Sequence, residues 1–187
     1  MPPKIKVTKE DIIRVSLDMI RTGGAQTINA RTIAANMQCS TQPIFSNFSS
    51  MDALLKAVMQ RADELYHSYI QNEVASGQYP AYKASGMAYI RFAKEEKELF
   101  KLIFMRDRTN CEDTHGNASF ADMVSFVQSY TGLSEADAKL FHLEIWAVVH
   151  GIATMFATGF LDLDWDLVSK MISDAYLGLR KQYGMEG

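Results

Sequence analysis

The stretch from Asn29 to Phe48, NARTIAANMQCSTQPIFSNF, constrains the fold most, because its pattern predicts two short helices joined by a tight turn. Asn29 is expected to cap a helix that runs to about Met37, since its side-chain oxygen can accept from the first free backbone N–H groups. Ile33 and Met37 are four residues apart and fall on one face of that helix. A compact helical pair is therefore predicted near the N-terminus.

The second helix of the pair is predicted over residues 41–47, with Ser40 as its cap. Pro43 would lie in its first turn, where the missing N–H costs little. Ile44 and Phe48 continue an inward face, which leaves an outward face of Thr41, Gln42, Ser46 and Asn47. Side chains of this kind meet base edges and phosphates when the second helix of a helix-turn-helix enters a major groove. Two ordinary packed helices are the alternative that this motif alone leaves open.

Charge is distributed unevenly along the 187 residues, whose formal net charge is −3. Up to Lys56 there are seven basic and four acidic residues, a local charge of +3 that leaves −6 for the rest. A basic head on an acidic body suits a protein that presents one end to DNA, and ordinary charge scatter is the competing explanation. The 48% hydrophobic composition is sufficient for an ample core.

The two cysteines do not form a metal-type or redox-type pair in the sequence. Cys39 is expected in a buried turn as a small hydrophobe, and Cys111 in a polar loop. The chain shows no signal-peptide pattern, and we find no apolar run long enough to cross a bilayer. A cytoplasmic protein without a membrane partner is therefore expected.

Helical periodicity continues along the rest of the chain. Thr8 with Asp11 is expected to open a helix that ends at a Gly-Gly pair, and Ser49 to open a long helix that reaches about residue 75. A loop is predicted over residues 106–117, and further helices over residues 79–94, 99–105, 120–132, 134–158 and 166–183. No alternating strand pattern appears, so the predicted fold class is all-α, with about nine helices.

No residue pattern supports catalysis, because the chain has no nucleophile elbow, P-loop or dinucleotide fingerprint. His142, Glu144 and His150 form the most tempting metal-ligand set. The two histidines are eight residues apart and are offset by roughly 80° around a helix. Neither an HExxH motif nor a Cys/His pair accompanies them. We therefore expect no metal, no cofactor and no enzymatic activity.

Residues 27–55 resemble the DNA-binding domain of the TetR (tetracycline repressor) family of bacterial transcription regulators. Ile33-Ala34 is similar to that family's Ile-Ala pair in the first motif helix. The segment Ile44–Phe48 resembles the signature Leu-Tyr-x-Tyr/His-Phe, and the segment Ser49–Leu55 resembles the Ser-Lys-Glu-Ala-Leu opening of the next helix. At four places this chain lacks the residues that commonly contact phosphate in the family: Gln42-Pro43, Phe45, Asn47 and Met51.

After residue 55 the resemblance to the family is weaker. Trp146 followed by His150-Gly151 resembles the Trp…His-Gly pattern of one C-terminal subgroup, whose Phe-rich segment is similar to residues 99–105. The resemblance implies a DNA-binding domain over residues 1–54 and a ligand-binding and dimerisation domain over residues 55–187. It also implies a homodimer that packs the last two helices of each subunit into a four-helix bundle. Small residues on the penultimate helix permit such close approach, with an intramolecular core as the alternative: Ala147, Gly151, Ala153 and Ala157.

The chain is accordingly expected to be a transcription repressor that binds a palindromic operator in double-stranded DNA as a dimer and is released by a small apolar effector. The alternative from another class is a helical small-molecule-binding protein or enzyme that has lost operator binding. The residues expected at DNA are Thr27, Arg31, Ser40, Thr41, Gln42, Pro43, Phe45, Ser46, Asn47 and Lys56. Aromatic and methionine side chains form adaptable apolar walls, although core packing explains each of them equally well. On that basis the residues expected at an effector are Phe100, Phe104, Met105, Met123, Trp146, His150 and Phe156.

Overall fold

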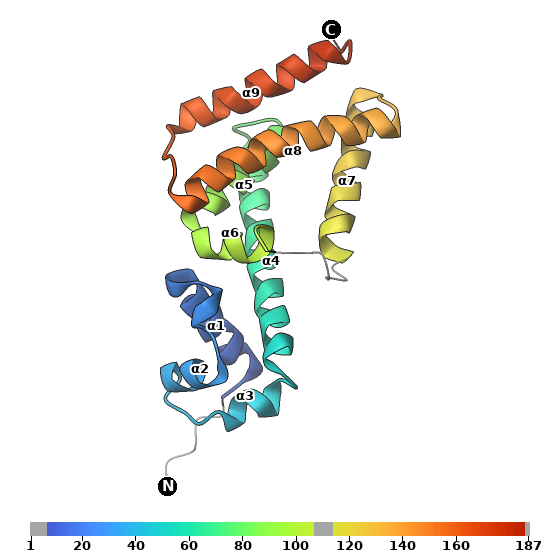
Figure 1. Ribbon diagram of the computed structural model, residues 1–187. Helices are drawn as coiled ribbons and strands as arrows, with labels where there is room; N and C mark the ends of the chain where they lie inside the picture. Colours follow the sequence, from blue (N-terminus) through green and yellow to red (C-terminus); the bar gives the residue numbers. More distant parts are fainter. Residues whose placement is uncertain (1–6, 107–113, 186–187) are drawn as a thin grey trace. The chain divides into compact units, whose positions relative to one another are not determined.

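The computed structural model describes residues 7–106 and 114–185, and every regular element in these ranges is a helix (Figure 1). The all-α prediction is confirmed there, with nine α-helices and one short 3₁₀ helix. The chain divides into two compact units, one of residues 1–69 and 95–106 and the other of residues 70–94 and 107–187. The predicted boundary after residue 54 separates a DNA-binding part from a ligand-binding part and is not a boundary between packed units. It stays a prediction.

The first unit contains the N-terminal helices, the first part of α4 (Met51–Ala75) and α6 (Lys97–Phe104). Its N-terminal elements are α1 (Lys9–Gly23), η1 (Ala25–Thr27), α2 (Ala30–Asn36) and α3 (Gln42–Asn47). As predicted, Thr8 and Asp11 form a reciprocal capping box at the start of α1, with both backbone-to-side-chain bonds at 3.1 Å. The core of the unit includes Ile12, Ile20, Ile33, Ile44 and Leu54, which are all fully or almost fully buried.

Helix α6 is fixed to the end of α1 by a two-pronged ion pair. The Arg21 guanidinium donates from Nε and Nη2 to the two carboxylate oxygens of Glu96, each at 2.9 Å. This fork geometry fixes orientation as well as distance. The apolar segment expected over residues 99–105 is the body of this helix, whose buried side chains are Leu99, Phe100, Leu102 and Ile103.

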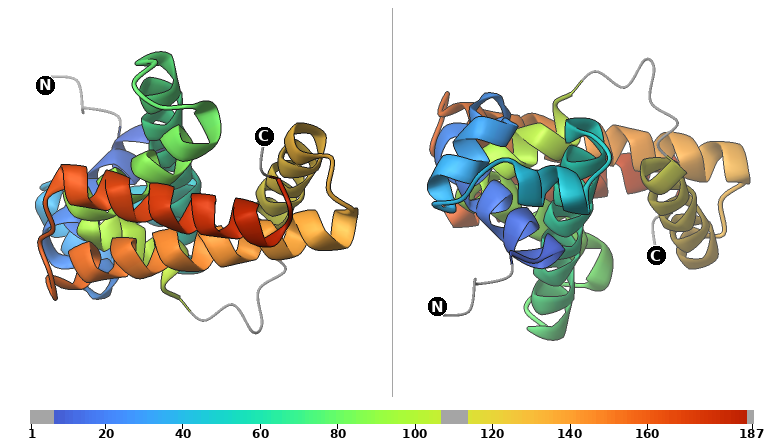
Figure 2. Two further views of the ribbon diagram at one scale, coloured as in Figure 1. Left: turned by 90° about the horizontal axis from the view of Figure 1, so that it is seen from above. Right: turned by 90° about the horizontal axis from the view of Figure 1, so that it is seen from below.

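The second unit contains the end of α4 and the helices α5 (Ala81–Glu95, except its last residue), α7 (Thr114–Thr131), α8 (Glu135–Thr158) and α9 (Trp165–Gln182). Helix α8 packs against both α7 and α9, and α9 runs along its length (Figure 2). As predicted, Ser134 caps α8 by accepting from the backbone N–H of Asp137 at 3.1 Å. A Cβ at Gly86 would lie only 3.3 Å from Val149, so α5 and α8 are in close contact at this glycine.

Four local predictions are wrong. Residues 114–117, expected in a loop, form the first turn of α7. Ser50, not Ser49, accepts from the N–H of Ala53 at the start of α4. Thr41, not Ser40, immediately precedes α3, and its backbone is already α-helical, so no extended cap residue presents its side chain to the helix N-terminus. Cys39 is half-buried rather than buried, and Cys111 lies outside the described residues.

Helix α8 is, contrary to the expectation from the sequence, long and apolar enough to cross a membrane by length and composition alone. The structure buries 44% of that apolar stretch. Phe141, Ile145, Ile152 and Phe156 all lie in the core of the second unit. Core packing therefore accounts for part of the hydropathy of α8, and Leu140, Leu143 and Trp146 on the same helix remain exposed.

Candidate functional site

The first helix of the predicted helix-turn-helix begins with a full capping box. The Asn29 side-chain oxygen accepts from the N–H groups of Arg31 and Thr32, both at 3.0 Å. In return the Thr32 hydroxyl oxygen accepts from the N–H of Asn29 at 2.9 Å, and its O–H donates to the Thr27 carbonyl at 2.8 Å. The Asn29 prediction is confirmed, and this network fixes where α2 begins relative to the preceding turn.

The turn between α2 and α3 closes with a left-handed residue. Gln38 has φ of +53°, in a region that favours glycine. The N–H of Cys39 bonds to the Ala34 carbonyl at 2.9 Å, and the N–H of Gln38 bonds to the Ala35 carbonyl at 3.1 Å. These two bonds form the Schellman pattern that ends many helices, and they set the direction in which α3 leaves the turn.

Replacing Gln38 by glycine is expected to stabilise the protein by about 1 kcal/mol, because it removes left-handed strain from a residue with a Cβ. The free energy of unfolding, measured by chemical denaturation of the full chain, reports this change. Gln128→Gly, at an exposed position inside α7, is the matched control and should destabilise by about 1 kcal/mol. A loss of stability in Gln38→Gly would contradict the role given to this backbone conformation.

Helix α3 presents its polar edge outward. Ile44 and Phe48 are buried beneath it, whereas Gln42 and Ser46 are exposed and Phe45 is 54% exposed. Thr41, Pro43 and Asn47 are half-buried. The Ser46 hydroxyl donates to the Gln42 carbonyl at 2.9 Å, and the Asn47 amide donates to the Pro43 carbonyl at 2.7 Å. Two of the side chains predicted to contact DNA thus donate hydrogen bonds to carbonyls of their own helix. Gln42 and Phe45 are therefore the side chains most available to an outside partner.

The remaining residues expected at DNA surround this helix. Arg31, Ser40 and Lys56 are exposed, on α2, in the turn and on the second turn of α4. Thr27 is half-buried, and its hydroxyl donates to the Gly24 carbonyl at 2.7 Å. The Thr27 hydroxyl proton is therefore used in a bond to the turn that follows α1. Only the lone pairs of its oxygen remain to accept a hydrogen bond from another partner.

Two tyrosine–histidine pairs connect α5 to α8 in the second unit. Tyr82 Oη lies 2.9 Å from His142 Nδ1, and Tyr89 Oη lies 2.8 Å from His150 Nδ1. Burial lowers the pKa of both histidines below the usual value of 6.5. A neutral imidazole whose Nδ1 carries no proton accepts a hydrogen bond from the tyrosine O–H. The indole of Trp146 stacks on the His150 ring, with centroids 4.7 Å apart and planes 14° apart.

These pairs make stability depend on pH. Between the lowered folded pKa and the unfolded value of about 6.5, the unfolded chain binds more protons, so stability is fully present above about pH 6.5 and is lost as pH falls below it. We expect Tm to drop between about pH 7.5 and about pH 5.5, and to drop less in the double variant His142→Gln, His150→Gln. His67→Gln, at an exposed position on α4, is the control. Equal pH dependence in all three proteins would contradict this assignment.

The seven residues expected at an effector fall in different units. Phe100, Phe104 and Met105 belong to the first, and Met123, Trp146, His150 and Phe156 belong to the second. Phe100 and Phe156 are buried core residues, whereas Trp146 is 42% exposed. Phe104 packs against Phe100, with ring centroids 5.1 Å apart. In the second unit, Trp146 and His150 stack on each other.

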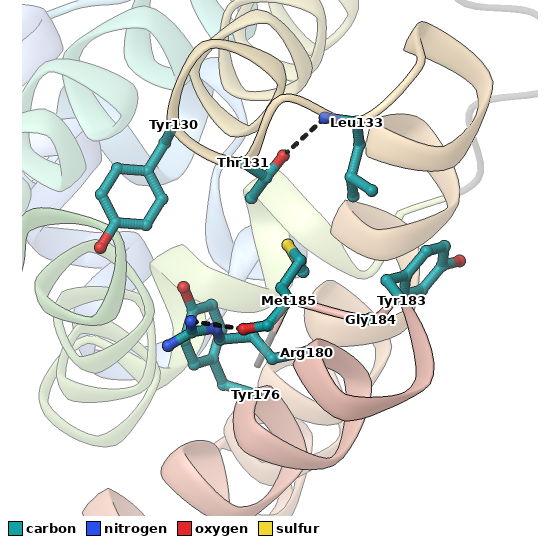
Figure 3. A pocket seen from close by; sticks show the side chains of 8 residues that line it. All are labelled: Tyr130, Thr131, Leu133, Tyr176, Arg180, Tyr183, Gly184 and Met185. Carbon is teal, nitrogen blue, oxygen red and sulfur yellow. Dashed lines mark hydrogen bonds between the residues drawn. The ribbon is translucent and has the colours of Figure 1, made fainter. Parts of the chain in front are cut away.

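A cavity of about 630 Å³ lies elsewhere in the second unit and contains none of these seven residues (Figure 3). Its lining, which we call the C-terminal pocket, consists of Tyr130, Thr131, Leu133, Tyr176, Arg180, Tyr183, Gly184 and Met185. No pattern in the sequence predicted this pocket. The glycine that follows the last apolar turn of α9 predicts a helix end, but nothing in the pattern predicts that α7 approaches it.

Metal binding finds no support among the described residues, which contain no group of three or more His, Cys, Asp or Glu side chains placed to hold an ion. His142 and His150 instead bond to different tyrosines. Asp164, one of the alternating acids after α8, caps α9 by accepting from the N–H groups of Asp166 and Leu167.

Residues 82–174 match the family of tetracyclin repressor-like C-terminal domains. A TetR-like transcriptional regulator from Rhodococcus sp. RHA1 has a similar fold, with 13% identity, a TM-score of 0.71 and coverage of 98% of this chain and 99% of that one. A protein of unknown function from the same organism shares 20% identity at a TM-score of 0.74, covering 97% and 98% of the two chains. No curated protein matches the sequence.

A helix-turn-helix of α2 and α3, in a chain that continues into a larger set of packed helices, is the build of a DNA-binding transcription regulator. The match over residues 82–174 identifies the helical body, and the fold likeness extends over the head as well. The chain belongs to the TetR family.

Proposed function

We propose that this TetR-family protein is a cytoplasmic, ligand-responsive repressor that binds a palindromic operator as a homodimer. The observation that carries the proposal is the exposed edge of α3, which a buried Ile44 and Phe48 hold in place. An apolar side with a polar and aromatic outer edge is what a recognition helix requires. The proposal requires no catalytic group.

Gln42 and Phe45 would carry most of the base recognition. A glutamine amide pairs with the N6 and N7 edge of adenine, and a phenylalanine ring contacts the methyl group of thymine. Arg31 and Lys56 would contact phosphates, together with Thr27, Ser40 and Thr41 through hydroxyl oxygens. Pro43, Ser46 and Asn47 would complete the contact along the helix. Phe45 thus replaces a phosphate contact by a base contact, and the operator half-site should contain both A and T.

The dimer would form through α8 and α9. Leu140, Leu143 and Leu177 are large apolar side chains that the protomer leaves exposed on these helices. Gly151 and Gly178 lie inside α8 and α9, and a Cβ built at either position meets no atom within 4 Å. A glycine inside a helix destabilises that helix by roughly 1 kcal/mol relative to alanine. Because no contact within the protomer requires a glycine at these two positions, close approach of a helix from a second protomer would explain them.

An apolar effector would act through the body, with Trp146 and His150 as its nearest contacts in the second unit. Ligand binding changes DNA affinity only to the extent that it favours one conformation over another. The effector must therefore prefer a spacing of the two heads that does not match the operator, by a few kcal/mol.

Retention of genomic fragments on immobilised protein tests the proposal at low cost. A repressor should enrich a small set of fragments that share an inverted repeat, with half-sites about one helical turn or a multiple of it apart. Retention of fragments without a shared sequence would favour the competing class, a helical ligand-binding protein without operator recognition.

A further inference from the structure

The C-terminal pocket lies entirely within the second unit, where three elements meet. Tyr130 and Thr131 end α7, Leu133 stands in the turn to α8, and Tyr176 and Arg180 project from α9 (Figure 3). The Leu133 N–H donates to the Thr131 hydroxyl at 3.3 Å, which helps to hold the turn. The cavity volume of about 630 Å³ is in the range of small-molecule sites.

The floor of the pocket is built by the end of α9. Gly184 has φ of +67°, the N–H of Gly184 bonds to the Lys181 carbonyl at 3.1 Å, and the N–H of Met185 bonds to the Arg180 carbonyl at 2.9 Å. This Schellman turn folds the chain back over its own last turn. The Arg180 side chain adds a bond from Nη2 to the Met185 carbonyl at 2.6 Å. The guanidinium is thereby held at the pocket wall.

The chemistry of the lining is cationic and aromatic. Arg180 is its one charged residue, and no acidic side chain is among the eight. The guanidinium has five N–H donors, of which the bond to Met185 uses one. Three tyrosine rings supply flat walls, and Arg180 lies 6.0 Å from the centroid of one of them, Tyr176. Burial, followed by the Tyr130 hydroxyl, raises the pKa of Tyr176, so that phenol stays a neutral hydrogen-bond donor at pH 7.

An aromatic stack continues from the pocket rim. Tyr130 is 70% exposed, and its ring lies parallel to that of Phe126, with an interplanar angle of 2°. Phe126 in turn stacks on Tyr82 at 24°. An exposed tyrosine held in parallel register is pre-organised to receive another flat ring, because ordering its side chain costs little further entropy.

We infer that the C-terminal pocket binds a small aromatic carboxylate, with the carboxylate on Arg180 and the ring against Tyr130 and Tyr176. The guanidinium fork matches a carboxylate, and the adjacent rings match an aryl group. This site is separate from the Trp146 and His150 cluster, shares no residue with it, and does not depend on DNA binding. Its ligand is anionic, whereas the effector proposed above is apolar.

Calorimetric titration of the full chain with 2-naphthoate tests the inference. We expect saturable binding, one ligand per chain, and weaker binding of both 2-naphthamide, which lacks the charge, and cyclohexanecarboxylate, which lacks the aromatic ring. Arg180→Met should weaken 2-naphthoate binding about tenfold or more, because a charge-assisted pair is lost. Lys181→Met removes the same charge from the adjacent exposed position, outside the pocket, and should bind as the wild type does.

Tyr130→Leu gives a second reading that does not depend on how Arg180 affects folding, because the Tyr130 side chain is mostly exposed. Its 2-naphthoate affinity should fall several-fold, at unchanged cyclohexanecarboxylate affinity, since one stacking wall is removed. The inference is overturned if the wild type shows no saturable binding, if 2-naphthamide binds as tightly as 2-naphthoate, or if Lys181→Met loses as much affinity as Arg180→Met.

Discussion

Replacing Gln42 by alanine should weaken binding to the operator by about 1–3 kcal/mol, roughly fivefold to more than a hundredfold, while the dimer stays intact. Gln42 lies on the exposed edge of α3 next to a buried Ile44, so the substitution removes a reading group without opening the core. The loss should be confined to the specific complex. The salt dependence of binding should keep its slope, because no phosphate contact is removed.

Gln71→Ala, at an exposed position on α4, is the matched control for Gln42→Ala and should bind operator DNA like the wild type. Fluorescence anisotropy with a specific and a scrambled duplex at the same salt concentration separates the two effects. If Gln42→Ala keeps the full ratio of specific to non-specific affinity, the reading face is not the one assigned to α3.

Replacing Gly151 by arginine should separate the dimer into folded monomers and abolish operator binding at the same protein concentration. A Cβ at Gly151 meets nothing within 4 Å, so the isolated protomer accommodates the new side chain. In the proposed α8–α9 interface the charge would be buried without a partner, at a cost of about 3–5 kcal/mol. Sedimentation velocity reports the shift in mass, and circular dichroism confirms that the helices remain.

Ala136→Arg places the same side chain at an exposed position in the first turn of α8 and should leave the dimer unchanged. A Gly151→Arg protein that remains dimeric and binds its operator would place the dimer interface away from the middle of α8. If Gly151→Arg unfolds and Ala136→Arg does not, the fold of the single protomer requires glycine at position 151, and the space around it is not open as described.

The helix starts were predictable where one capping side chain decides them. Thr8, Asn29 and Ser134 each precede an apolar periodic segment, and each accepts the predicted backbone bonds. The misplaced starts fall where two adjacent residues are equally good caps, at Ser49-Ser50 and at Ser40-Thr41. Local sequence cannot choose between such neighbours, because the choice depends on how the preceding turn is closed. At α3 that turn contains Gln38, whose left-handed backbone no sequence rule indicated.

The residues proposed to contact DNA are more readily picked out from the sequence than those proposed to contact a ligand. The proposed DNA contacts lie within thirty consecutive residues, from Thr27 to Lys56, so local periodicity orders them. The proposed ligand sites combine side chains from α7, α8 and α9, and the same aromatic residue serves equally well as core or as wall. Phe156 proves to be core, whereas Trp146 stays partly exposed. The C-terminal pocket was missed because it depends on the approach of α7 to the end of α9.

The two tyrosine–histidine pairs likewise came from packing. His142 and His150 were noticed as candidate ligands on one helix, but their partners, Tyr82 and Tyr89, are about sixty residues away in the sequence. The seven-residue step between the tyrosines and the eight-residue step between the histidines are each close to two helical turns, so α5 and α8 can bring both pairs into contact.

Binding of the purified protein to the intergenic DNA upstream of its own gene, at a series of salt concentrations, tests the central claim most directly. We expect a saturable complex of one dimer per inverted repeat that survives an excess of unrelated DNA at physiological salt. Binding that is weak, unselective and erased by salt, at this DNA and at every fragment retained from the genome, would contradict the claim that α3 reads an operator.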